Sequence, residues 1–197
     1  MAFRNTKLRY GTVAMTLHWL IAIALIFMIG FGYYLSTLPL TDPGLYSLVQ
    51  LHKSIGLTIL TLSVLRIVWR LINPVPPLPD TLSRPMKILA RLTHIALYVL
   101  IVAIPFTGWA MVSASPLGLP TMWFGLFEWP HIAPLAHLPF DQKDAKEEAI
   151  HTVHAWLAYG TAALLLLHAG AALLHHHRMK DDTLRRMLPG MRLKGET

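Results

Sequence analysis

The sequence predicts an all-α integral membrane protein, a bundle of four transmembrane helices. Two observations predict this class. More than half of the 197 residues are hydrophobic and only 14% are charged, which is unusual for a soluble domain. Four apolar segments are also long enough to cross a bilayer core, which takes about 20 helical residues. The predicted spans are residues 12–35, 47–72, 88–113 and 149–174, and we expect residues 1–197 to form one transmembrane domain.

The first span follows three basic residues, Arg4, Lys7 and Arg9, and so resembles a secretory signal. It is longer than a typical signal core and is not followed by an A-x-A cleavage site, so we interpret it as a retained helix. Residues 73–87 are rich in proline and predict an extended connector. We expect residues 115–148 to form a loop that holds a short interfacial helix.

The distribution of lysine and arginine predicts the orientation. The N-terminal segment, the connector with its flanks and the C-terminal tail hold fourteen of the seventeen basic residues. By the positive-inside rule, both termini are cytoplasmic. The net charge of +7 therefore reflects contact with membrane lipids, not with nucleic acid. The absence of cysteine excludes disulfides, thiolate nucleophiles and cysteine-ligated metal clusters.

Histidines at matched depths are the main candidates for a functional site. His154 and His168 are fourteen positions apart, a rise of about 21 Å that returns them to one helix face. His151 lies about 100° from that face. His18 matches His168 in depth on the cytoplasmic side, and His52 matches His154 on the outer side. Histidine inside a span is costly, which makes a functional role the default hypothesis.

Other residues of the spans fit this arrangement. Gly32, Gly56 and Gly108 lie at outer depth, where glycine permits close approach of either a cofactor or a neighbouring helix. Arg66 lies fourteen residues after His52, on the same face at the inner end. It could contact an anionic group such as a haem propionate, or it could extend to the membrane interface.

The histidine pairs favour haem iron over zinc. A zinc site normally has a third protein ligand, and the spans offer neither cysteine nor carboxylate for it. Two trans imidazoles fill the axial positions of a haem, which favours electron transfer. Because no C-x-x-C-H motif occurs, each haem would be bound non-covalently, as haem b.

At these residues the chain resembles the bacterial di-haem cytochrome b-561 family. The resemblance covers nearly the whole chain and rests on RYGTVAMTLHWL, LHKSIGLTIL, NPVPP, LTHIALYVL, LHAGAALLHHH and KDDTLRRMLPG. It implies four helices and two b haems stacked across the bacterial inner membrane. The implied axial ligands are His18 and His168 on the cytoplasmic side, and His52 and His154 on the periplasmic side. His94 matches a recurrent family histidine near the quinone end, which implies quinone binding or support of the haem site. A buried hydrogen bond is the alternative.

Some members of the family resemble superoxide oxidases, and this implies a superoxide:ubiquinone oxidoreductase. Superoxide would be the periplasmic donor and ubiquinone the acceptor. Lys53, next to His52, could steer a small anion, or it could simply extend to the lipid headgroups. The outer loop is net acidic, which opposes steering.

Two other functions stay open. Similar proteins serve as membrane electron-transfer subunits of larger dehydrogenases or hydrogenases, and such a subunit would need a redox partner protein. Alternatively, the chain could be a non-redox metal or lipid carrier, because His175, His176 and His177 form a run that could bind metal.

Overall fold

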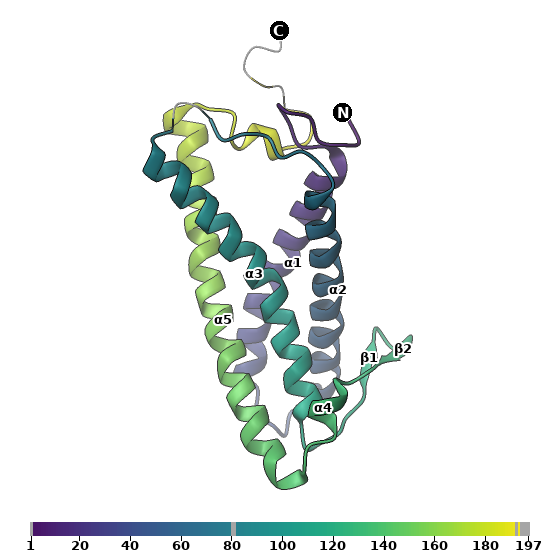
Figure 1. Cartoon of the computed structure of the whole chain (residues 1–197). Helices are drawn as coiled ribbons and strands as arrows, with labels where there is room; N and C mark the ends of the chain where they lie inside the picture. Colours follow the sequence, from purple (N-terminus) through teal and green to yellow (C-terminus); the bar gives the residue numbers. More distant parts are fainter. Residues whose placement is uncertain (1, 80–81, 192, 194–197) are drawn as a thin grey trace. The chain divides into compact units, whose positions relative to one another are not determined.

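The computed structural model describes residues 2–79, 82–191 and 193 (Figure 1). The chain is mostly helical. In order, its elements are α1 (Thr12–Thr37), α2 (Leu45–Leu71), α3 (Arg84–Ala114), β1 (Thr121–Trp123), β2 (Phe127–Trp129), α4 (Ala133–Ala136) and α5 (Phe140–Leu174), followed by a π-helical turn (His175–Met179) and a 3₁₀ turn (Arg185–Met187).

Four helices among the described residues are long and apolar enough to cross a membrane: α1, α2, α3 and the continuous helix Phe140–Met179. This confirms the prediction of a helical protein with four spans. The helical form follows from the bilayer itself, because a spanning segment must satisfy its backbone N–H and C=O groups internally.

The loop before the fourth span is shorter than predicted, and its structure is different. The helix α5 begins at Phe140 and not near residue 149, so residues 141–148 are helical. Pro139 directly precedes α5, and its carbonyl accepts the N–H of Gln142. The residues that follow are mostly good helix formers with Lys143 and Glu147 at i, i+4 spacing, which extends the helix beyond its apolar part.

The rest of that loop forms a β-hairpin, which was not predicted, and the single helical turn α4, a short helix where a short helix was predicted. The proline-rich connector is also shorter than predicted, because α3 begins at Arg84 with Pro85 as its second residue. Proline is favoured in the first turn of a helix, since its missing N–H has no intrahelical partner there.

The chain forms two compact units, and we describe each separately. Unit 1 comprises residues 1–22, 62–99 and 163–197, and unit 2 comprises residues 23–61 and 100–162. The prediction of a single transmembrane domain over residues 1–197 stays a prediction.

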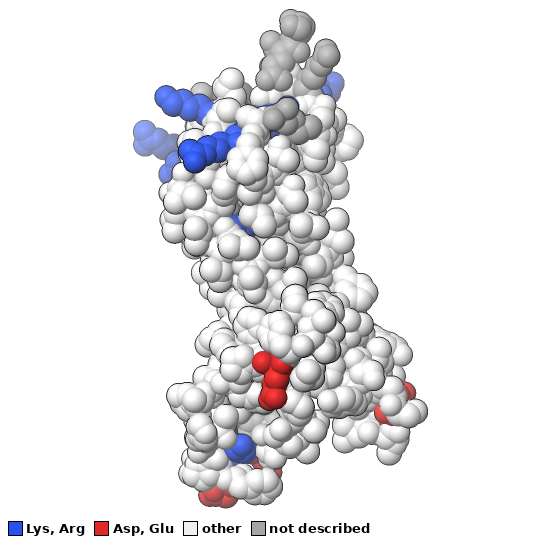
Figure 2. All heavy atoms as spheres, turned by 90° about the vertical axis from the view of Figure 1, so that its right-hand side faces the viewer, with Lys and Arg blue, Asp and Glu red and all other residues white. Residues whose placement is uncertain are grey.

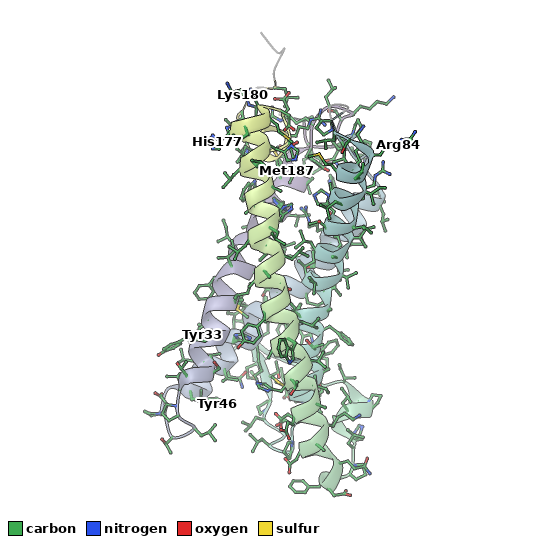
Figure 3. All side chains as sticks on the ribbon, turned by 90° about the vertical axis from the view of Figure 1, so that its left-hand side faces the viewer. Tyr33, Tyr46, Arg84, His177, Lys180 and Met187 are labelled. Carbon is green, nitrogen blue, oxygen red and sulfur yellow. The ribbon has the colours of Figure 1, made fainter. Side chains whose placement is uncertain are left out.

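In unit 1 the C-terminal tail is bonded to the N-terminal part of the chain. The Trp19 indole N–H donates to the Met187 carbonyl at 2.7 Å, and Arg186 donates to the Pro77 carbonyl at 2.6 Å. Figure 3 labels Met187, in the 3₁₀ turn, and His177, in the π-helical turn that follows α5. The tail and the connector are thus attached to the end of α1 that carries His18.

Unit 1 also holds most of the basic residues. It has fourteen Lys and Arg against four Asp and Glu, whereas unit 2 has three against six. In Figure 2 most of the visible blue atoms gather in one region, and much of the remaining surface is white. The charge is therefore segregated between the two units, as the positive-inside rule requires of a membrane protein.

In unit 2, β1 and β2 pair antiparallel, with Thr121 opposite Trp129 and Trp123 opposite Phe127. The turn between them is closed by a hydrogen bond from Leu126 N to Trp123 O at 2.9 Å. Its central residues, Phe124 and Gly125, both have positive φ, 47° and 73°, as in a type I′ turn. Figure 1 shows the hairpin beside α2, and side chains of α2 hold it there.

Candidate functional site

Each unit contains one of the two predicted histidine pairs. In unit 1, the imidazoles of His18 on α1 and His168 on α5 have ring centres 6.3 Å apart, with planes at 73°. In unit 2, those of His52 on α2 and His154 on α5 have centres 6.4 Å apart, with planes at 69°. These are the two pairs that depth predicted, and α5 contributes one histidine to each.

The spacing within each pair fits a shared metal ion. Metal–imidazole bonds are about 2 Å long and a ring nitrogen lies about 1.1 Å from its ring centre, so two trans imidazoles have centres about 6.2 Å apart. Both measured separations are within 0.2 Å of that value. The residues present therefore fit the axial positions of a haem iron in each unit. Their role as ligands stays a prediction.

The hydrogen bonds of His154 fix its tautomer. Its Nδ1 lies 3.0 Å from the Ile104 carbonyl oxygen and 3.0 Å from the Thr107 hydroxyl oxygen. A carbonyl oxygen can only accept, so Nδ1 carries the proton and donates it. The other nitrogen, Nε2, then keeps its lone pair, which is the form of imidazole that binds a metal. The Thr107 hydroxyl in turn donates to the Ile104 carbonyl at 2.7 Å, which leaves its oxygen free to accept from Nδ1.

Two glycines lie against the outer histidines, as their positions in the sequence suggested. A Cβ atom added at Gly32 would lie 3.3 Å from His52 Cε1, and one added at Gly108 would lie 3.3 Å from His154 Cε1. Carbon atoms in ordinary contact are about 3.5–4.0 Å apart, so a side chain at either position would press on an imidazole. Gly56 differs, because its nearest neighbour is Met28 at 3.9 Å.

His94 and Arg66, the other predicted site residues of unit 1, lie near the pair formed by His18 and His168. The ring of His94 packs edge-on against His168 with centres 5.5 Å apart. Arg66 donates to the Ala14 carbonyl at 3.0 Å and lies over the Tyr98 ring at 5.5 Å. The guanidinium of Arg66 therefore stays within the protein, and this contact with α1 is a role that the sequence did not reveal.

Lys53 is bonded within unit 2. Its Nζ donates to the Pro120 carbonyl at 3.2 Å and to the Thr121 hydroxyl at 3.3 Å. The ammonium group therefore holds the base of the hairpin, a contact that the sequence did not predict. The role of Lys53, the residue after His52 in the sequence, in steering an anion stays a prediction.

The remaining histidines lie outside both pairs. His151 is exposed, in agreement with its position off the ligand face of α5. His175 Nδ1 lies within hydrogen-bond distance of an Asp181 carboxylate oxygen, at 2.6 Å. Burial opposes ionisation of Asp181, but hydrogen bonds from Thr183 and His175 outweigh it and lower the pKa of the carboxyl. Within residues 2–79, 82–191 and 193, no three or more His, Asp or Glu side chains are grouped so as to hold a metal ion.

Thr107 is the site residue that sequence reasoning missed. Pro105 is not a signal for it, because the N–H that this proline lacks would bond the Ile101 carbonyl, one turn earlier. Thr107 and His154 instead bond the Ile104 carbonyl, so the contact depends on the packing of α5 against α3, which the sequence does not reveal.

Comparison with known proteins gives consistent matches over nearly the whole chain. A family model described as "Prokaryotic cytochrome b561" matches residues 9–190. "Cytochrome b561 homolog 2" of Escherichia coli (strain K12) is 39% identical over 189 residues, which is 95% of each chain. "Probable superoxide oxidase CybB" of Yersinia pestis is 33% identical over 188 residues, 93% of this chain and 98% of the relative.

Proposed function

The chain belongs to the prokaryotic cytochrome b561 family of membrane electron-transfer proteins, and we propose that it is an inner-membrane superoxide:ubiquinone oxidoreductase with two haems b. The observation that carries the proposal is the pair of facing imidazoles in each unit, at the separation that one iron atom requires. The relative named as a probable superoxide oxidase supports the choice of donor.

The family implies haem b, which accepts and donates one electron at a time when it is bound. We propose that His18 and His168 hold one haem, and that His52 and His154 hold the other. The tautomer of His154, fixed by Ile104 O, supports this role because it leaves Nε2 free to bind iron.

The proposed reaction balances as two one-electron oxidations and one two-electron reduction. Two superoxide ions are oxidised to two O₂, and the two electrons together with two protons convert ubiquinone to ubiquinol. Because superoxide carries a negative charge, we propose that Lys53 attracts it toward the outer site. Two of the three N–H donors of Lys53 are directed at Pro120 and Thr121, and the third is the one proposed to face the anion.

We assign the inner end to ubiquinone. His94, packed on His168, is proposed to bind the quinone or to support the haem site. Arg66 is proposed to neutralise a haem propionate with the donors that Ala14 does not use. The basic excess of unit 1 supports a cytoplasmic location for both termini.

The test uses the purified protein with haem and a matched set of measurements. A reduced-minus-oxidised spectrum should show a b-type band, and pyridine haemochrome analysis should give two haems per chain. Stopped-flow mixing with superoxide should reduce the haem, and liposomes containing ubiquinone should then form ubiquinol. An oxidised spectrum that superoxide leaves unchanged would remove superoxide as the donor. In that case, co-purification of a redox subunit would favour the role of a subunit in a larger dehydrogenase or hydrogenase.

A further inference from the structure

The β-hairpin of unit 2 is docked along α2 by polar side chains spaced one helical turn apart. Gln50 donates to the Pro120 carbonyl at 2.7 Å and accepts the Met122 N–H at 3.2 Å. Ser54 accepts the Phe124 N–H at 3.0 Å. These side chains satisfy backbone groups along the free edge of β1, as a neighbouring strand would.

These contacts show how the hairpin runs along the helix. Pro120, before β1, bonds to Gln50, whereas the Trp123 indole N–H bonds to Thr58 Oγ1 at 3.1 Å, two helical turns further along α2. The base of the hairpin is therefore near the start of α2, and β1 leads toward the middle of the span.

The length of α2 then fixes the depth of the hairpin. A bilayer core takes about 20 residues of helix, and α2 has 27. Wherever that stretch falls within Leu45–Leu71, it includes residues 52–64. Ser54 and Thr58 are thus at the depth of the hydrocarbon, and so are the hairpin residues bonded to them.

The side chains around the turn suit that depth. Phe124, Leu126 and Phe127 are 48%, 73% and 47% exposed. Phe124 also holds a backbone conformation with φ of 47°, for which asparagine or glycine would be less strained. The rings of Phe124 and Phe127 pack against Trp123 with centres 5.1 Å and 5.3 Å away, so the turn presents an aromatic cluster whose phenylalanines are partly exposed.

We propose that β1–β2 is a re-entrant hairpin whose turn inserts into the acyl chains of the outer leaflet. The proposed occupant of the exposed apolar surface is lipid, because Ser54 and Thr58, which bond the turn, lie at hydrocarbon depth by the length of α2. Backbone at this depth is tolerated where the protein satisfies it, which Gln50 and Ser54 do for β1. The strand β2 is three residues long, and its exposed Glu128 lies opposite Met122, so β2 leads from the turn back toward the base of the hairpin and the hydrated headgroups.

The chain has no cysteine, so single-cysteine labelling tests the proposal without background. Nitroxide spin labels would be placed by Leu126→Cys at the turn, Glu128→Cys in β2, and Asp144→Cys as the control on the polar start of α5. Each variant would be reconstituted into phospholipid vesicles with its haem content checked. Collision rates with oxygen, which partitions into lipid, and with a water-soluble nickel complex would then be measured.

We expect collisions with the nickel complex at position 126 to be several-fold rarer than at position 144, and oxygen collisions to be more frequent. Position 128 should give intermediate values. A label at position 126 that meets the nickel complex as often as the control would place the turn in water and overturn the proposal. Exclusion of both reagents at position 126 would also overturn it, because protein and not lipid would then cover the turn. The proposal does not depend on the identity of the electron donor or acceptor.

Discussion

The glycines that face the outer histidines give a sharp test of the site in unit 2. A Cβ at Gly32 would lie 3.3 Å from His52 Cε1, a few tenths of an ångström inside ordinary contact. We expect Gly32→Ala to displace the imidazole slightly and to keep the haem, at a cost of about 1 kcal/mol or less. Gly32→Val adds two methyl groups about 1.5 Å beyond Cβ, which cannot fit beside the ring, and should abolish binding of one haem. The same series at Gly108 tests His154.

The matched controls are Gly30→Val on α1 and Gly160→Val on α5, because a Cβ at either glycine would have no neighbour within 4 Å. All four glycines lie in helices, so differences between the test and control variants do not arise from helix propensity. The measurements are haem content per chain and a redox-titrated visible spectrum. If Gly32→Val and Gly108→Val both retained two haems with unchanged potentials, the imidazoles would not occupy the positions described here, and the haem site in unit 2 would be refuted.

Three further predictions concern individual side chains. His154→Ala should lose one haem and keep the other, whereas the exposed His151→Ala should keep both; equal loss in the two variants would contradict the facial argument. Thr107→Val should weaken binding of one haem by about tenfold. This is the lower end of the range for residues that hold a metal ligand, because Ile104 O still accepts a hydrogen bond from His154. Thr107→Ser, which keeps the hydroxyl, should restore haem binding. Asp181→Asn should free the tail from His175 and speed its cleavage by trypsin several-fold. Since the pKa of Asp181 is lowered on folding, its stabilising contribution should be complete above about pH 4 and decline as the pH falls through the pKa of the folded protein. If trypsin cleaved the tail equally fast in the wild-type protein and in Asp181→Asn, the contact between His175 and Asp181 would be contradicted.

The spans and the histidine pairs could be predicted from sequence because both depend on rules that act along one helix. Hydropathy over about 20 residues identifies a span, and 3.6-residue periodicity places His154 and His168 on one face. Thr161, between them, is fully buried, whereas Leu166 and Leu167 on the other side are 75% and 69% exposed. The orientation of the ligand face of α5 thus agrees with the periodicity.

The hairpin could not be predicted, because its stability comes from contacts between segments. Its strands are three residues long, and Phe-Gly is a poor turn sequence beside Asn-Gly. Side chains of α2 hold it in place, at positions some seventy residues earlier in the chain. The same is true of Lys53, whose bonds to Pro120 and Thr121 are invisible to a reading of its neighbours in sequence.

The two imidazoles of unit 2 are held in different ways, and this has consequences for function. His154 Nδ1 donates to two oxygens, Ile104 O and Thr107 Oγ1, so hydrogen bonds set both its tautomer and its ring orientation. His52 Nδ1 is buried and has no hydrogen-bond partner among the described residues, so packing alone orients its ring. That packing comes from the contact with Gly32 and from Phe31, whose ring centre is 5.7 Å away. Because an imidazole whose other ring nitrogen is unbonded is held less firmly than one that is hydrogen-bonded, His52 is the proposed ligand that a change in packing should release first.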